Sequence, residues 1–146
     1  MLAIRVRNAS LKYDFARTGT TSTLWLDGAL VHRLSISDGM QVKAKVRVTI
    51  DTAPRQKPHD IGSLLYTPPT HDTGASIDVW LHASPEDVEA LYAKAQSAPF
   101  AYLLVQSPQV TGDTWRMGTD NSAEVDAFSF RASSVPCFDD AADATT

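Results

Sequence analysis

Apolar and polar residues alternate over most of this chain, most clearly between residues 40 and 50. Every even-numbered residue in that stretch is apolar, whereas the odd-numbered positions include Lys43, Lys45 and Arg47. A period of two residues is typical of a β-strand with one buried face. The pattern therefore predicts a strand that turns its even-numbered residues toward the core.

Two Asp-Gly pairs, at residues 27–28 and 38–39, separate this strand from the apolar runs before it. Asp-Gly between apolar runs is a strong hairpin signal. A three-residue loop ending at each glycine keeps apolar residues opposite one another, for example Leu34 opposite Val42. We therefore predict a three-stranded meander whose even-numbered residues all face inward.

The hydrophobic period changes near residue 84. Ser84 is a favoured helix N-cap, Pro85 suits the first helical position, and apolar residues follow at helical spacing. These signals predict one α-helix at about residues 84–96. Further strands are predicted at residues 2–7, 11–15, 61–67, 76–83, 100–106, 114–118 and 124–132. About nine strands and one helix favour an antiparallel β-sandwich, with a partly open β-barrel as the alternative.

The length of 146 residues and the hydrophobic content of 43% fit one globular domain. We place this β-rich domain at residues 1–138 and interpret the small, acidic residues 139–146 as a flexible tail. Residues 1–60 hold ten Lys and Arg against five Asp and Glu, whereas residues 61–146 hold three against twelve. This asymmetry is explained either by pairing within the domain or by a self-association surface.

The beginning of the chain lacks the apolar run of a secretion signal, and no stretch of about 18 apolar residues occurs. We therefore expect a cytoplasmic protein without a membrane span. The single cysteine, Cys137, cannot form an intramolecular disulfide and has the apolar neighbours of a core filler.

Four residues are candidates for a binding surface. Asp78, Trp80 and His82 share the polar face of their predicted strand, and Trp25 points outward in the meander. An indole on such a face is covered by another part of the fold, covered by a second subunit, or used to stack on a ligand. We expect Trp80 to be shielded from bulk water, with a second subunit as the favoured cover.

A second candidate is His32, which the predicted register places on the inward face opposite Ser22. The pair is explained by a buried histidine bonded to a hydroxyl, or by a general base or ligand in an internal cavity. A serine and a histidine alone do not define a catalytic site, and no Gly-x-Ser-x-Gly turn is present.

The sequence contains few signals for the binding of metals, cofactors or nucleic acids. The His-Asp pairs at 59–60 and 71–72 are separated by a predicted strand, so we expect no shared metal site. No phosphate-binding glycine loop occurs, and no cofactor is expected. Lys43, Lys45 and Arg47 form a basic stripe, but no aromatic residue interleaves it and the chain is acidic overall.

No motif fixes a reaction, so the functional hypotheses rest on surfaces. The leading one is a non-enzymatic interaction or assembly module that acts as a homo-oligomer. The alternative is a small-ligand-binding protein or minor enzyme with an internal cavity around His32. A third is weak binding of single-stranded nucleic acid through the basic stripe.

Overall fold

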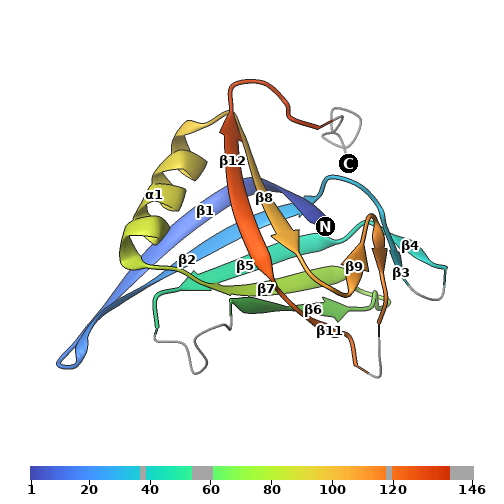
Figure 1. Ribbon diagram of the computed structural model, residues 1–146, viewed down its shortest axis with the longest axis horizontal. Coiled ribbons are helices and arrows are strands. Elements are labelled where there is room, and N and C mark those ends of the chain that lie inside the picture. Colours follow the sequence, from blue (N-terminus) through green and yellow to red (C-terminus); the bar gives the residue numbers. More distant parts are fainter. Residues whose placement is uncertain (37–38, 54–60, 118–119, 139–146) are drawn as a thin grey trace.

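The computed structural model describes residues 1–36, 39–53, 61–117 and 120–138, and in this part of the chain it contains twelve strands and one helix (Figure 1). The protein is mainly β, as the sequence predicts. The strands are β1 (Leu2–Ala16), β2 (Gly19–Leu30), β3 (Leu34–Ile36), β4 (Gln41–Val42), β5 (Lys45–Asp51), β6 (Gly62–Thr67), β7 (Ser76–His82), β8 (Phe100–Gln106), β9 (Val110–Thr111), β10 (Thr114–Trp115), β11 (Ser122–Glu124) and β12 (Ala127–Ser133). The helix, α1 (Pro85–Ser97), lies within one residue of its predicted ends.

Eight strands form a curled sheet in the order β11-β6-β7-β5-β2-β1-β8-β12, and four short strands form a second sheet in the order β4-β3-β10-β9. The edge strands β11 and β12 follow one another directly in the chain, with only Val125 and Asp126 between them. Val125 donates its backbone N–H to Gly62 on β6, and Asp126 donates to Gln106 on β8. The two edges of the sheet therefore meet at this joint. This curled sheet with a small second sheet fits the predicted β-sandwich or partly open barrel.

The expectation of a wholly antiparallel arrangement is wrong for two strand pairs. β5 pairs with β7 in parallel, and β3 pairs with β10 in parallel. The chain between β5 and β7 builds β6, which lies on the far side of β7. This excursion brings β7 back beside β5 in the same direction, and nothing in the local alternation of residues marks such a crossover.

The predicted hairpin at residues 27–28 does not form. β2 continues through Gly28, and a side chain there would collide with the backbone carbonyl of Arg5 on β1. The glycine therefore permits a close approach of two strands next to a bulge between Val6 and Asn8. The chain turns instead just before Gly19, which has φ of +134°, so that the two predicted N-terminal strands form one long strand.

The second Asp-Gly turn is confirmed in register. Leu34 lies opposite Val42, Ile36 donates its N–H to the Met40 carbonyl, and Gly39 has φ of +89°. Ser37 and Asp38 themselves lie outside the described residues. The predicted strand of residues 40–50 is divided, because β4 joins the second sheet and β5 joins the curled sheet.

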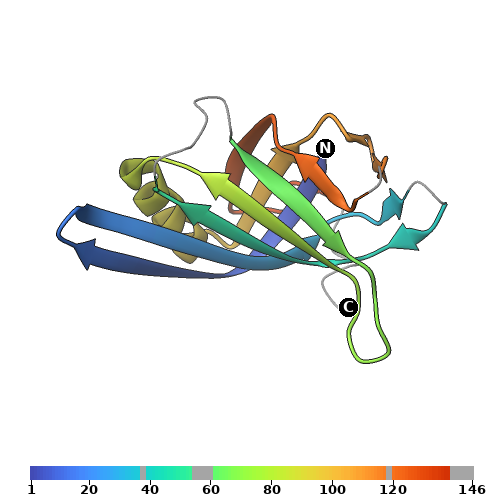
Figure 2. The same cartoon turned by 90° about the horizontal axis from the view of Figure 1, so that it is seen from below.

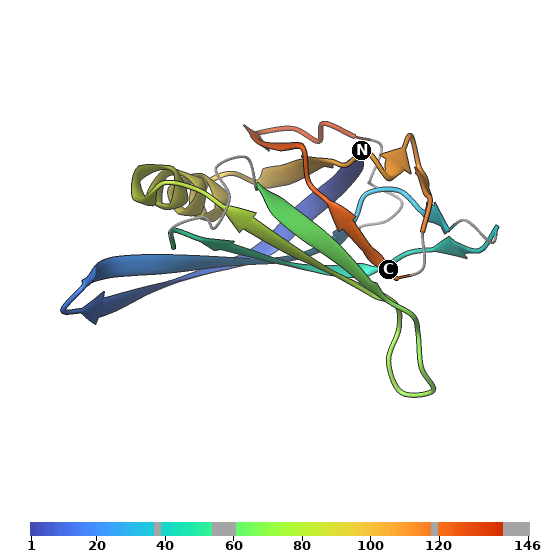
Figure 3. The same cartoon turned by 60° about the horizontal axis from the view of Figure 1, so that its bottom comes forward.

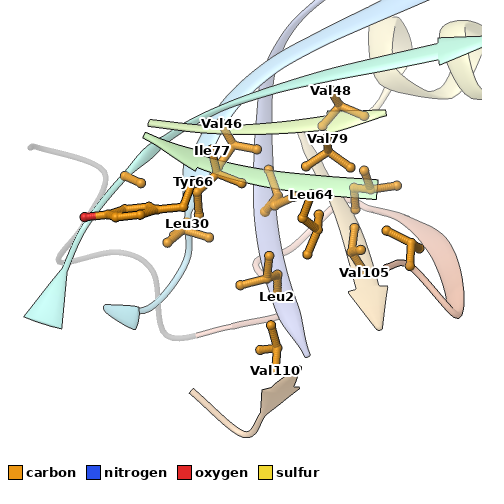
Figure 4. Close-up of a cluster of buried hydrophobic side chains, with 14 of the residues drawn as sticks. Leu2, Leu30, Val46, Val48, Leu64, Tyr66, Ile77, Val79, Val105 and Val110 are labelled. Atoms are coloured by element: carbon orange, nitrogen blue, oxygen red, sulfur yellow. The ribbon is translucent and has the colours of Figure 1, made fainter. Parts of the chain in front are cut away.

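The concave side of the curled sheet holds the main hydrophobic core. Side chains from β5, β6, β7 and β8 interdigitate there with those of the second sheet (Figure 4). β8 is buried on both faces, because Tyr102 and Leu104 pack on its other side with Val31. Cys137 and Phe138 border this smaller cluster, which agrees with the expectation that Cys137 fills apolar space.

Candidate functional site

A pocket opens on the side of the barrel where the sheet edges diverge from the Val125–Asp126 joint. It has a volume of about 670 Å³ and lies between the end of β7, α1 and β12. We call it the α1–β12 pocket. Seven of its twelve lining residues are apolar; the lining consists of Ile61, His82, Ala83, Ser84, Asp87, Ala90, Leu91, Lys94, Ala127, Phe128, Ser129 and Phe130.

The beginning of α1 is fixed by the signals that predicted it. The Ser84 side chain accepts the backbone N–H of Asp87 at 3.1 Å, which confirms Ser84 as the N-cap. Acidic residues in the first turn complement the positive end of the helix dipole. Val88 is fully buried, and Leu91 and Tyr92 pack against the core.

One side of α1 is attached to β1 and the other side lines the pocket. Tyr13 donates its hydroxyl to the Glu89 carboxylate at 2.7 Å, and the Gln96 amide donates to the Ala9 carbonyl at 3.3 Å. The pocket side is formed by residues 87, 90, 91 and 94, whose spacing places them on one helical face. The helix is thus held from the β1 side while its other face borders open space.

His82, at the end of β7, borders the pocket and pairs with Asp51, which is not one of the lining residues. The His82 Nδ1 atom lies 2.7 Å from Asp51 Oδ1, and both side chains are partly exposed. Because β5 and β7 run parallel, the two residues are direct neighbours at the same end of the sheet. A carboxylate bonded to Nδ1 favours the tautomer whose Nε2 accepts a hydrogen bond. The arrangement suits recognition of a hydroxyl or another donor.

The outer face of the curled sheet brings together the four predicted binding residues. Asp78, Trp80 and His82 alternate along β7, and Trp25 lies on β2 with only β5 between the two strands. Figure 3 shows α1, β8 and β12 on the opposite, concave side. Trp80 is 41% exposed and Trp25 is half-buried. Among the described residues, neither the loop at residues 68–74 nor α1 covers Trp80 completely, so a large part of its indole stays open.

His32 and Ser22 are not brought together, and the prediction that His32 faces inward is wrong. His32 is exposed, and its ring contacts Phe138 at 6.1 Å between centroids. Ser22 is buried, lies opposite Tyr13, and donates its backbone N–H to the Thr52 hydroxyl. The pairing with Ser22 depended on the hairpin at residues 27–28 and fails with it. The inward assignment extended the alternation of the 37–39 hairpin back to residue 32, but residues 31–33 lie between β2 and β3 and belong to no strand.

The other sequence candidates do not converge on a site. Among the described residues no three His, Cys, Asp or Glu side chains are grouped closely enough to hold a metal ion. His71 and Asp72 are exposed, whereas the pair at 59–60 lies outside the described residues. The basic stripe is partly neutralised, because Arg47 Nε lies 3.2 Å from Asp27 Oδ1.

Sequence reasoning missed most of the α1–β12 pocket. The sequence predicts a helix at about residues 84–96 and a strand at residues 124–132, but it does not predict that the two elements face each other. The pocket arises because β12 lies opposite α1, and no local signal in either segment reports that proximity. The single hint in the sequence is the i, i+3, i+4, i+7 spacing of Asp87, Ala90, Leu91 and Lys94. This spacing places a small and an apolar residue between two charged residues on one helical face.

No protein-family model, no curated protein and no solved structure matches this chain. No helix in the described ranges is long and apolar enough to cross a membrane.

Proposed function

We propose that the protein binds a small, mainly apolar molecule in the α1–β12 pocket. The observation that supports this is the pocket itself: its volume of about 670 Å³ is within the range of small-molecule sites, and its lining is mostly apolar with a few polar groups. This is the ligand-binding alternative raised by the sequence, at a different place from the one expected.

The polar groups at the two ends of the pocket differ in charge. Asp87 and His82 lie at the first turn of α1, and Lys94 lies two turns further on. Seven residues of helix correspond to about 10.5 Å. Lys94 forms no ion pair with any residue the structure describes, so its ammonium group is available to a ligand. A bound molecule would place its apolar body against Leu91 and Phe128 between these ends.

The test uses two exposed alanines of α1 as a matched pair. Ala90 lines the pocket, whereas Ala93 does not. The neutral dye N-phenyl-1-naphthylamine, whose fluorescence rises in apolar surroundings, is titrated into wild-type, Ala90→Trp and Ala93→Trp protein. Saturable binding should weaken at least about tenfold in Ala90→Trp, because the indole projects into the pocket and occupies space that the dye needs. It should be unchanged in Ala93→Trp. Equal binding by both variants, or no saturable binding by the wild type, would contradict the proposal.

Self-association is a second candidate, supported by the projecting β1–β2 hairpin (Figures 1 and 2). Its tip exposes Phe15 at 81%, stacked on Tyr13 at 6.3 Å between ring centroids. Exposed aromatic pairs often mark protein contacts. In sedimentation equilibrium the wild type should show a concentration-dependent mass above 15.9 kDa, and Phe15→Ser should remove it. A monomer at all concentrations would rule out this candidate.

A further inference from the structure

The outer face of the curled sheet carries two indoles in one row. Trp80 on β7 and Trp25 on β2 both lie directly across from Thr49 on β5, which separates them. Neighbouring strands are 4.7–4.9 Å apart, so the two tryptophans are rooted about 10 Å from each other. Thr49 is short, and we call these three residues the tryptophan row.

Charged groups border the tryptophan row on both sides. Two residues along the strands, Arg47 lies between Asp78 and Asp27, and its guanidinium bonds Asp27 at 3.2 Å. A hollow of about 340 Å³ opens there, where Gly28 and Ser76 leave room. On the other side of the row lies the His82–Asp51 pair. Hydrogen-bond donors and acceptors thus lie on both sides of the tryptophan row.

This combination of groups disfavours several kinds of partner. The centre of a protein–protein interface is depleted of charged residues, whereas here charged rows flank both indoles. A protein partner would have to desolvate them at considerable cost. Nucleic acid and anionic membranes are disfavoured too, because the three carboxylates of Asp27, Asp51 and Asp78 outnumber the two cationic groups of Arg47 and Lys45.

We propose that the tryptophan row binds an extended, neutral, β-linked polysaccharide. A pyranose ring has an apolar C–H face that stacks on an indole and a rim of hydroxyls that bonds carboxylates and guanidinium groups. In an extended β-1,4-linked chain successive rings are flipped, so the same face recurs at every second sugar. That repeat matches the separation of Trp80 and Trp25. The chain would cross the strands over Thr49, with its hydroxyls reaching Asp78 and Arg47.

The experiment titrates cellohexaose and chitohexaose into the full chain by isothermal calorimetry. At least one of them should bind saturably, and the matching disaccharide should bind at least about tenfold more weakly, because it reaches one indole only. Trp80→Ala should weaken hexasaccharide binding by a similar factor, since one stacking contact is lost. Trp80→Phe should retain most of it. Circular dichroism would establish that each variant is folded.

Two control variants separate stacking from general effects. Val135→Ala removes a 62% exposed apolar residue after β12, and Phe15→Ala removes an exposed aromatic residue of the hairpin tip; neither should change sugar binding. The pocket dye should bind Trp80→Ala as it binds the wild type, so this proposal and the pocket proposal fail separately. The inference would be overturned if neither hexasaccharide bound saturably, or if Trp80→Ala bound as tightly as the wild type. It would also be overturned if the wild type were a dimer and Trp80→Ala a monomer, because Trp80 would then lie in a subunit interface.

Discussion

The two faces of β5 and β7 show how differently adjacent residues of one strand are constrained. On the concave face each apolar residue of these strands is at most 2% exposed, as for Val48, Val79 and Leu81. On the outer face Trp80 keeps 41% of its surface exposed. The concave face is therefore fixed by close packing, whereas the outer face can change its residues without disturbing the core. A large aromatic residue on the less constrained face is more readily explained by binding than by stability.

The sharpest test of this comparison substitutes Leu81 on the concave face and its neighbour Trp80 on the outer face, and compares the stabilities of the two variants. Leu81→Ala should lower the free energy of unfolding by about 2–5 kcal/mol, because it leaves a cavity in a fully packed region. Trp80→Ala should lower it by less than about 1 kcal/mol. Urea denaturation followed by far-ultraviolet circular dichroism measures both. Equal losses would show that the outer face is packed as tightly as the inner one.

Gly28 is a position in the curled sheet where a larger side chain cannot be accommodated. Gly28→Ala should destabilise the protein by about 1–3 kcal/mol, because the new methyl group meets the Arg5 carbonyl and forces β1 and β2 apart. At Gly74 no heavy atom lies within 4 Å of the place a Cβ atom would occupy, so Gly74→Ala is the matched control and should be nearly neutral. Thermal denaturation of both variants provides the comparison, and a neutral Gly28→Ala would refute the close approach.

The cover of the concave side depends on the beginning of α1. Ser84→Ala should reduce stability by about 1 kcal/mol, because the Asp87 N–H loses its acceptor. Ser97→Ala, at the other end of α1, should have a smaller effect. Chemical denaturation distinguishes the two, and equal effects would argue against a capping role for Ser84.

The smallest expected effect concerns the contact between the hairpin and α1. The hydrogen bond to the Glu89 carboxylate raises the pKa of the Tyr13 phenol above its ordinary value, because the nearby negative charge disfavours the phenolate. The contribution of this contact is present below the ordinary pKa of tyrosine and is lost as the pH rises through the raised value. Glu89→Gln should bring the Tyr13 pKa back toward the ordinary range. Tyrosine resonances followed by NMR against pH would measure the change, and an unchanged pKa would exclude the contact.

Much of the architecture was predictable where local chemistry decides the structure. Alternation located β5 and β7, a continuous apolar run located β8, and the N-cap signals located α1. The two Asp-Gly pairs show the limit of such reasoning. Gly39 turns the chain, whereas Gly28 admits the Arg5 backbone, and only the position of a distant strand separates these outcomes.

The candidate sites also divide into features that local sequence predicts and features that depend on distant strands. Alternation was sufficient to place Asp78, Trp80 and His82 on one face, because all three belong to one strand. The proximity of Trp25 required knowing that β5 lies between β2 and β7. The α1–β12 pocket depends on contacts between elements that are far apart in sequence, so the local spacing of its helix residues was not sufficient to predict it.

The Val125–Asp126 joint also has a consequence for the order in which the chain is made and folded. β12 completes the sheet by pairing with β8, which itself pairs with the N-terminal strand β1. During translation the backbone groups along this edge of β8 therefore stay unpaired until Ser133 has left the ribosome, beside the apolar side chains of Leu103 and Val105. Late pairing of distant strands slows folding and prolongs the exposure of such edges. Newly made chains should consequently depend on chaperones, or on low temperature, until the last strand is in place.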